Sequence, residues 1–217
     1  MRTRSMGYVT LAAAVAWTAF LGTQQAAWAH PVAPGGRPTA AQVDADRLGE
    51  IALTETDLTG NLQRVAEQSG PIVAESQREY FVVFTHPALF EPERLERLPL
   101  GTLLAVMSDL AIPVDDRGPD ELEDRARTIR AMFEGSGTVD PLDAPTIGED
   151  SRAYTIRLLS RDVVLGAQPR TTVAILLRRL GVYAIVYVTA HGATEPLDEA
   201  VRLARLLDER LERAGGA

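Results

Sequence analysis

The chain has 217 residues, a formal net charge of -8 and no cysteine, which excludes disulfide bonds and a lipid-modified N-terminal cysteine. Lysine and arginine together number 22 and all of them are arginine, so catalysis by a Schiff-base lysine and phosphate binding by a loop lysine are also excluded. The excess of acidic groups disfavours binding to nucleic acid.

The first 29 residues have the order of a secretory signal peptide. Arg2 and Arg4 precede an apolar run from Tyr8 to Leu21, and the triplet Ala27-Trp28-Ala29 supplies the small residues of a cleavage site. The run is shorter than the roughly 20 residues of a membrane-spanning helix. We therefore predict a signal peptide at 1–29 and a secreted or periplasmic protein with no membrane span after cleavage; a retained N-terminal anchor is the alternative.

The remaining chain is predicted to form a flexible leader at 30–38, which is rich in proline and glycine, and a single α+β domain at 39–214. Thr39 and Gln42 have capping-box spacing, which indicates a short helix through about Leu48. We expect a loop over Ala52–Leu62 and then a first strand near Leu62–Glu67.

Two apolar runs and one amphipathic segment follow. Tyr80–Thr85 has the length of a strand covered on both faces, and Thr102–Leu110 indicates a strand or a short buried helix. Pro119–Glu134 is predicted to be a helix because one of its faces carries apolar residues at spacings of four, three and four: Leu122, Ala126, Ile129 and Phe133. Gly135–Asp150 is expected to be a loop.

The last third of the chain predicts three strands and a closing helix. The strands are Tyr154–Ser160, Thr171–Arg178 and Val182–Ala190, and the last two form a hairpin at Leu180-Gly181. Pro196 opens an amphipathic helix through Arg213, which can cover the small aliphatic face of the last strand. The fold class is therefore α+β, with a mostly antiparallel sheet flanked by helices.

Several segments resemble small exported bacterial α/β/α proteins of the Mog1/PsbP-like type, a group that includes mycobacterial lipoproteins and kinase sensor domains. They are ALTETDL at Ala52–Leu58, IGEDSRAY at Ile147–Tyr154, LLRRLGVYAIVYV at Leu176–Val188, and the closing helix. The resemblance implies a module outside the cytoplasm that binds a ligand or a partner, with no catalytic residues to carry over. This chain differs from the lipoprotein members because it has no cysteine to acylate.

Tyr183 and Tyr187 share one face of the last predicted strand, and Tyr154 lies on a neighbouring strand. Tyrosines on a sheet face can line a ligand pocket, because each offers apolar area and a hydroxyl group. The alternative is that they fill a second core layer beneath the Pro119–Glu134 helix. We name Tyr154, Tyr183 and Tyr187 as candidate ligand-binding residues.

Three functions remain open. The preferred one is a soluble, non-catalytic binding module for an unknown small molecule or protein, without cofactor or metal. A second is a secreted copper protein in which the new N-terminal His30 acts with another histidine, such as His86 or His191. The third is a structural or export-assisting protein. Hydrolysis by an activated serine is not indicated, since the chain has no G-x-S-x-G motif. Calcium binding is not indicated either, since the acidic loops lack EF-hand spacing.

Overall fold

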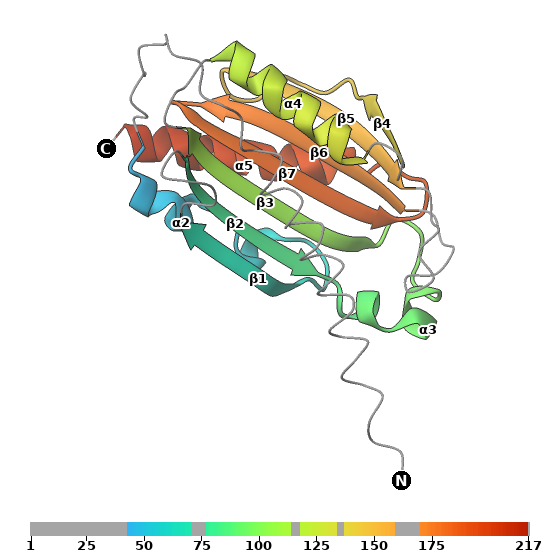
Figure 1. The fold of residues 1–217 in the computed structure, drawn as a ribbon. Coiled ribbons are helices and arrows are strands. Elements are labelled where there is room, and N and C mark those ends of the chain that lie inside the picture. Colours follow the sequence, from blue (N-terminus) through green and yellow to red (C-terminus); the bar gives the residue numbers. More distant parts are fainter. Residues whose placement is uncertain (1–42, 71–76, 114–117, 134–136, 159–169, 217) are drawn as a thin grey trace.

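The computed structural model describes residues 43–70, 77–113, 118–133, 137–158 and 170–216 (Figure 1). The predicted signal peptide at 1–29 and leader at 30–38 lie outside these ranges. Within the ranges, no helix is both long enough and apolar enough to cross a membrane.

The described residues form one seven-stranded antiparallel sheet with strand order β1-β2-β3-β7-β6-β5-β4. The strands are β1 (Gln63–Gly70), β2 (Gln77–Thr85), β3 (Leu103–Pro113), β4 (Gly137–Pro141), β5 (Asp150–Leu158), β6 (Arg170–Arg179) and β7 (Val182–His191). The helices are α2 (Leu48–Ile51), α3 (Pro92–Leu95), α4 (Pro119–Phe133) and α5 (Leu197–Gly215), with short 3-10 turns η1 (Ala45–Arg47), η2 (Glu55–Asp57) and η3 (Pro87–Phe90). The predicted α+β class is confirmed.

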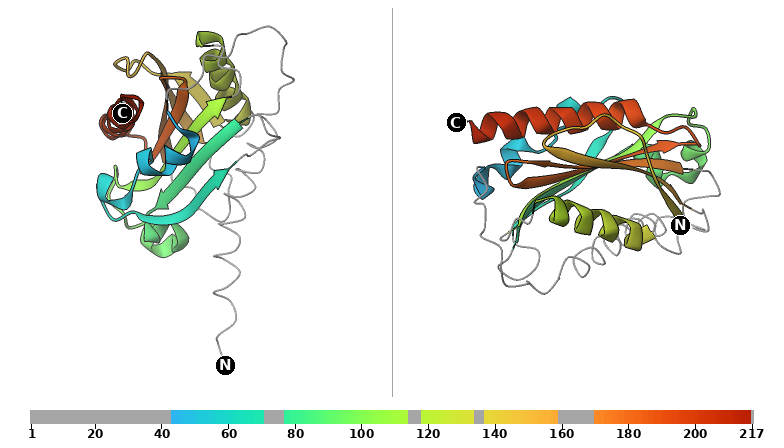
Figure 2. Two further views of the ribbon diagram at one scale, coloured as in Figure 1. Left: turned by 90° about the vertical axis from the view of Figure 1, so that its left-hand side faces the viewer. Right: turned by 90° about the horizontal axis from the view of Figure 1, so that it is seen from above.

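The two long helices cover opposite faces of the sheet, as Figure 2 shows from above. α5 packs on β6 and β7, and five of its residues are buried there: Ala200, Leu203, Ala204, Leu207 and Leu211. They contact the small aliphatic face of β7, which carries Val182, Ala184, Val186 and Val188. Burial of this apolar surface away from water stabilises the layer.

α4 contacts β4, β5 and β6 on the other face. Its predicted apolar residues are all buried there, together with the aromatic side of β7: Leu122, Ala126, Ile129, Phe133, Tyr183, Ile185 and Tyr187. Of the helices described, none lies over β1 and β2 on this side, whereas α2 contacts β2 on the α5 side (Figures 1 and 2). On the α4 side, a described helix therefore covers β4, β5 and β6, but none covers β1 and β2.

Most predicted elements are found with shifted ends. Thr102–Leu110 is a strand, extended to Pro113, and not a helix. The prediction that Gly135–Asp150 is wholly a loop is wrong, because Gly137–Pro141 forms the edge strand β4. A proline is tolerated there because it ends an edge strand, where its missing N–H removes no ladder hydrogen bond. The predicted helix through Leu48 begins outside the described residues, and helical structure continues to Ile51.

The predicted hairpin turn at Leu180-Gly181 is present between β6 and β7. Arg179 pairs with Val182 across it, and the φ angles of Leu180 and Gly181 are 54° and 76°. Two successive positive φ angles are the signature of a type I′ turn, whose twist matches that of the flanking strands. The turn fixes the register of the hairpin and therefore the face on which each tyrosine of β7 lies.

Gly148, in the segment between β4 and β5, packs closely against the β6–β7 hairpin. Its φ is +74°, and a Cβ atom added to it would lie 2.5 Å from the carbonyl oxygen of Arg178. The next residue, Glu149, donates its N–H to that carbonyl at 2.9 Å. Only glycine allows both the backbone conformation and the close approach.

We expect Gly148→Ala to destabilise the protein more than Gly60→Ala does. Gly60 has a similar φ of +83° but open space around it, so both variants carry about 1–2 kcal/mol of backbone strain. Gly148→Ala adds a steric clash worth about 1–3 kcal/mol. Urea unfolding of the two variants measures the difference, and equal losses would show that the contact with Arg178 is unimportant.

Candidate functional site

The three predicted tyrosines all lie on the α4 side of the sheet and are buried. The backbone register places Tyr154 beside Ala174 and Ala174 beside Tyr187, so the two tyrosines flank a small residue. The Tyr154 hydroxyl accepts a hydrogen bond from Arg130 at 3.3 Å, and the Tyr183 hydroxyl donates to the carbonyl of Gly118 at 3.0 Å. The hydroxyl groups of Tyr154 and Tyr183 are therefore both hydrogen-bonded within the fold.

Two carboxylates that the sequence analysis did not identify lie in the same layer. Asp109 of β3 pairs with Ile185, and it therefore sits diagonally between Tyr183 and Tyr187 of β7. Glu79 of β2 pairs with Ala111 and is the diagonal neighbour of Asp109. Glu79 is only 5% exposed, and Asp109 is only 8% exposed. We refer to Glu79, Asp109, Arg125 and Tyr187 as the polar cluster.

Arg125 brings the positive charge of the cluster from α4. The residue is 2% exposed, and its Nε atom lies 3.1 Å from Oε1 of Glu121, one helical turn away. Its guanidinium carbon lies 4.8 Å from the centre of the Tyr183 ring, within the range of a cation–π interaction. The charge of Arg125 also acts on both Glu79 and Asp109.

Three oxygen atoms of the cluster are buried without a hydrogen-bond partner. They are Oε1 of Glu79, Oδ1 of Asp109 and the hydroxyl oxygen of Tyr187, a residue that is 6% exposed. Buried polar atoms in native proteins are nearly always hydrogen-bonded, to protein or to water, because an unpaired one destabilises the fold. Three such atoms in one layer make the polar cluster a candidate site.

Burial changes the protonation of the cluster. It raises the pKa of Glu79 to about 8, with a second contribution from the negative charge of Asp109, while Arg125 opposes the shift. Burial also raises the pKa of Asp109 to about 6, again against the charge of Arg125. The pKa of Tyr187 is raised above its ordinary value by burial and by Asp109, so the phenol stays neutral. Burial therefore favours the neutral form of Glu79.

The two histidines of the copper alternative that lie in the described residues, His86 and His191, each contact a backbone group. Nδ1 of His86 accepts a hydrogen bond from the N–H of Ala88 at the start of η3, and Nδ1 of His191 lies 3.1 Å from the carbonyl oxygen of Leu98. His30 lies outside the described ranges. Within those ranges, no group of three or more histidine, aspartate or glutamate side chains is placed to bind a metal ion.

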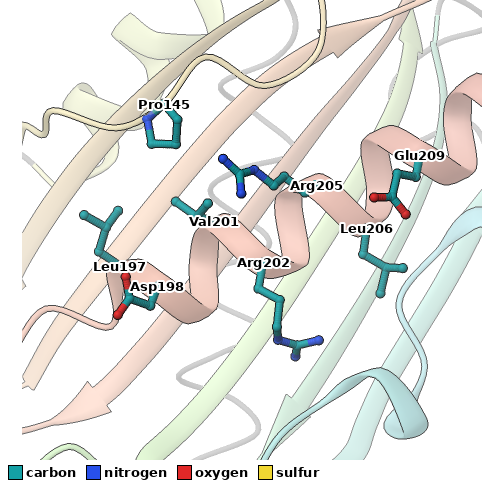
Figure 3. A pocket seen from close by; sticks show the side chains of 8 residues that line it. All are labelled: Pro145, Leu197, Asp198, Val201, Arg202, Arg205, Leu206 and Glu209. Carbon is teal, nitrogen blue, oxygen red and sulfur yellow. The ribbon is translucent and has the colours of Figure 1, made fainter.

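The other candidate is an open groove on the outer side of α5, with a volume of about 540 Å³ (Figure 3). It is lined by Pro145, Leu197, Asp198, Val201, Arg202, Arg205, Leu206 and Glu209. Its charges are mixed, and Arg202 is already occupied by Glu199 at 2.7 Å and by the carbonyl of Asp57 at 2.6 Å. Because the groove is open and its charged side chains are of both signs, the polar cluster is the stronger candidate.

We expect the stability of the protein to fall as the pH rises from 5 to 8.5. A folded-state pKa of about 8 for Glu79, above its ordinary value of 4.5, stabilises the fold at low pH, and this stabilisation is lost as the pH rises through 8. The glutamine of Glu79→Gln stays neutral at every pH. Between pH 5 and 8.5 the Tm of this variant should therefore fall by at least about 3 °C less than that of the unaltered protein, which corresponds to about 1 kcal/mol in the free energy of unfolding. Thermal unfolding of the variant, with exposed Glu93→Gln as control, measures this; parallel curves would contradict it.

Arg125→Met should destabilise the fold by about 3–5 kcal/mol, because it removes a buried positive charge that lies beside Glu121 and acts on the two cluster carboxylates. The control is Arg127→Met on the same helix, whose side chain is 66% exposed and pairs with Asp124. That exposed pair contributes at most about 1 kcal/mol. Guanidinium unfolding compares the two variants, and a similar small loss in both would show that Arg125 acts through packing alone.

Comparison of the chain with protein-family models, curated proteins and solved structures finds no match.

Proposed function

We propose that the chain is an exported, non-catalytic protein that binds a ligand or a partner through the polar cluster on the α4 side of the sheet. The observation that carries this proposal is the set of three buried oxygens without a hydrogen-bond partner, contributed by Glu79, Asp109 and Tyr187. Two of the three tyrosines named from the sequence, Tyr183 and Tyr187, lie next to Asp109 in this layer.

Binding is favoured over catalysis by the composition and enclosure of the cluster. A pair of carboxylates with raised pKa values can act as a general acid and base. That chemistry also requires a reacting bond and an attacking group beside them, and the cluster residues leave little surface to solvent. The cluster offers charge and hydrogen-bond acceptors in an apolar layer, which is the composition of a binding site.

The order of residues 1–29 supports export, because charge, apolar run and small-residue triplet follow each other as in signal peptides. The resemblance to Mog1/PsbP-like proteins supports the same location. An antiparallel sheet with a long helix on each face is the arrangement that this resemblance implies.

The test is to express the full chain in an exporting host and to record the native mass of the exported protein. We expect cleavage after Ala29, shown by N-terminal sequencing, and an additional small mass that is lost on denaturation. Asp109→Asn should lose this mass. Ser108→Ala should keep it, because Ser108 is the buried neighbour of Asp109 on the opposite face of β3.

Two results would overturn the proposal. Retention of the signal segment inside the cell would contradict export. A native mass equal to that of the polypeptide alone, together with no thermal stabilisation by any compound of a panel of amines, acids and sugars, would contradict ligand binding through the cluster.

A further inference from the structure

The open groove along α5 brings a guanidinium group beside an apolar strip (Figure 3). Leu197, Val201 and Arg205 follow each other at intervals of four residues, so they form one row along the outer side of the helix. Pro145, in the segment between β4 and β5, lies across the groove from this row. The strip made by Pro145, Leu197 and Val201 therefore ends at a positive charge.

The guanidinium of Arg205 is free to bind a ligand. Arg205 is exposed, and within the part of the chain that the structure describes it makes no hydrogen bond or ion pair. Other arginines of the same helix are occupied, since Arg202 pairs with Glu199 at 2.7 Å and Arg210 pairs with Asp57 at 2.7 Å. Arg205 is thus the groove arginine whose donors remain available.

The geometry of the helix explains why Glu209 does not neutralise Arg205. Long side chains on a helix lean toward its N-terminal end, so Arg205 extends toward Val201 and away from Glu209, as Figure 3 shows. An arginine that precedes a glutamate by four residues is also in the less favourable order for an ion pair along a helix. The positive charge is therefore held over the apolar strip.

We infer that this groove binds a monocarboxylate with an alkyl chain, with the carboxylate on the guanidinium of Arg205 and the chain along Val201, Leu197 and Pro145. A guanidinium group presents two parallel N–H donors, which match the two oxygens of a carboxylate. The groove volume of about 540 Å³ lies in the range of small-molecule sites. The site lies on the α5 side of the sheet and is separate from the polar cluster.

The acidic residues of the groove exclude other charged ligands. Asp198 and Glu209 also line it, and they repel a second negative charge, which disfavours phosphate and dicarboxylates. They are eleven residues apart, or roughly 16 Å along the helix, so that one small cation cannot contact both. A cation with an alkyl chain would also place its charge near Arg205 if the chain lay on the apolar strip.

The walls of the groove suit an alkyl chain better than a peptide. Pro145 has no N–H group to donate. The backbone groups of α5 around Val201 and Arg205 are bonded within the helix, where each N–H donates to the carbonyl four residues earlier. A peptide would bring backbone donors and acceptors that find no partners on this wall, whereas an alkyl chain needs none.

The competing explanation is that Arg205 is an ordinary solvated surface charge and that the groove holds only water, as is common for exposed arginines. The two explanations differ in their dependence on the ligand. A binding site requires both the negative charge and the alkyl chain of the ligand, whereas a solvated surface distinguishes neither.

NMR titration of the ¹⁵N-labelled exported protein with octanoate, kept below the concentration at which it forms micelles, tests the inference. Acetate, octylamine and 1-octanol are the comparison probes, because they lack the chain, reverse the charge and remove the charge, respectively. We expect saturable shifts of amide signals in α5 and next to Pro145 with octanoate. Each comparison probe should bind at least about tenfold more weakly, in keeping with the loss of apolar contact or of a charged hydrogen bond.

Variants on α5 test the role of each group. Arg205→Gln should weaken octanoate binding by about tenfold or more, and Val201→Ala by a smaller factor. The matched control is Arg213→Gln, because Arg213 is also exposed on α5 but does not line the groove, and it should leave binding unchanged. Arg205 and Arg213 are both exposed, so we expect both glutamine variants to fold, which an unaltered amide spectrum away from α5 would show.

Three results would overturn the inference. They are equal responses to octanoate and octylamine, equal octanoate binding by Arg205→Gln and the unaltered protein, and shifts that lie on the α4 side of the sheet instead of α5. The first two would show a solvated surface, and the third would show binding elsewhere. None of these variants alters the polar cluster, so the proposed function is tested separately by the native mass.

Discussion

The strict alternation of side chains along β7 is the constraint on which the rest of the structure depends. β7 lies at the centre of the sheet, paired with β3 on one side and β6 on the other. Its small aliphatic residues face α5, and its larger residues, Tyr183, Ile185 and Tyr187, face α4. A register slip by one residue would exchange these faces and bury the tyrosines beneath α5. The tight turn at Leu180-Gly181 opposes such a slip.

The polar cluster interrupts this layered packing on the α4 side of the sheet. Asp109 follows Ser108 in the middle of β3, a strand that is otherwise apolar, and Glu79 precedes the apolar run of β2. A hydrophobic residue at either position would satisfy packing without an unpaired oxygen. Buried ionisable groups are expensive in free energy, and such groups concentrate at functional sites. This contrast is why the proposed function rests on the cluster and not on the open groove along α5.

Sequence periodicity predicted the regular elements well and the site only in part. Helix α4, the β6–β7 hairpin and α5 each carry a strong local pattern, so their residues alone specify them. β4 was missed because a short edge strand with a terminal proline has the composition of a loop. Tyr183 and Tyr187 were named because they share a face of one strand. Glu79 and Asp109 were not, since their proximity depends on the register between β2 and β3, which no local pattern reveals; an acid inside an apolar run was the available signal.

The strand order has a consequence for how the molecule comes together. β1, β2 and β3 are sequential neighbours, as are β4, β5, β6 and β7, so the sheet consists of two meanders that are joined along β3 and β7. Glu79 and Asp109 belong to the first meander, and Arg125 and Tyr187 reach them from the second half of the chain. The cluster can form only after β3 and β7 have paired. A ligand bound at the cluster would therefore contact both meanders and slow their separation. Its dissociation would first weaken the pairing of β3 with β7.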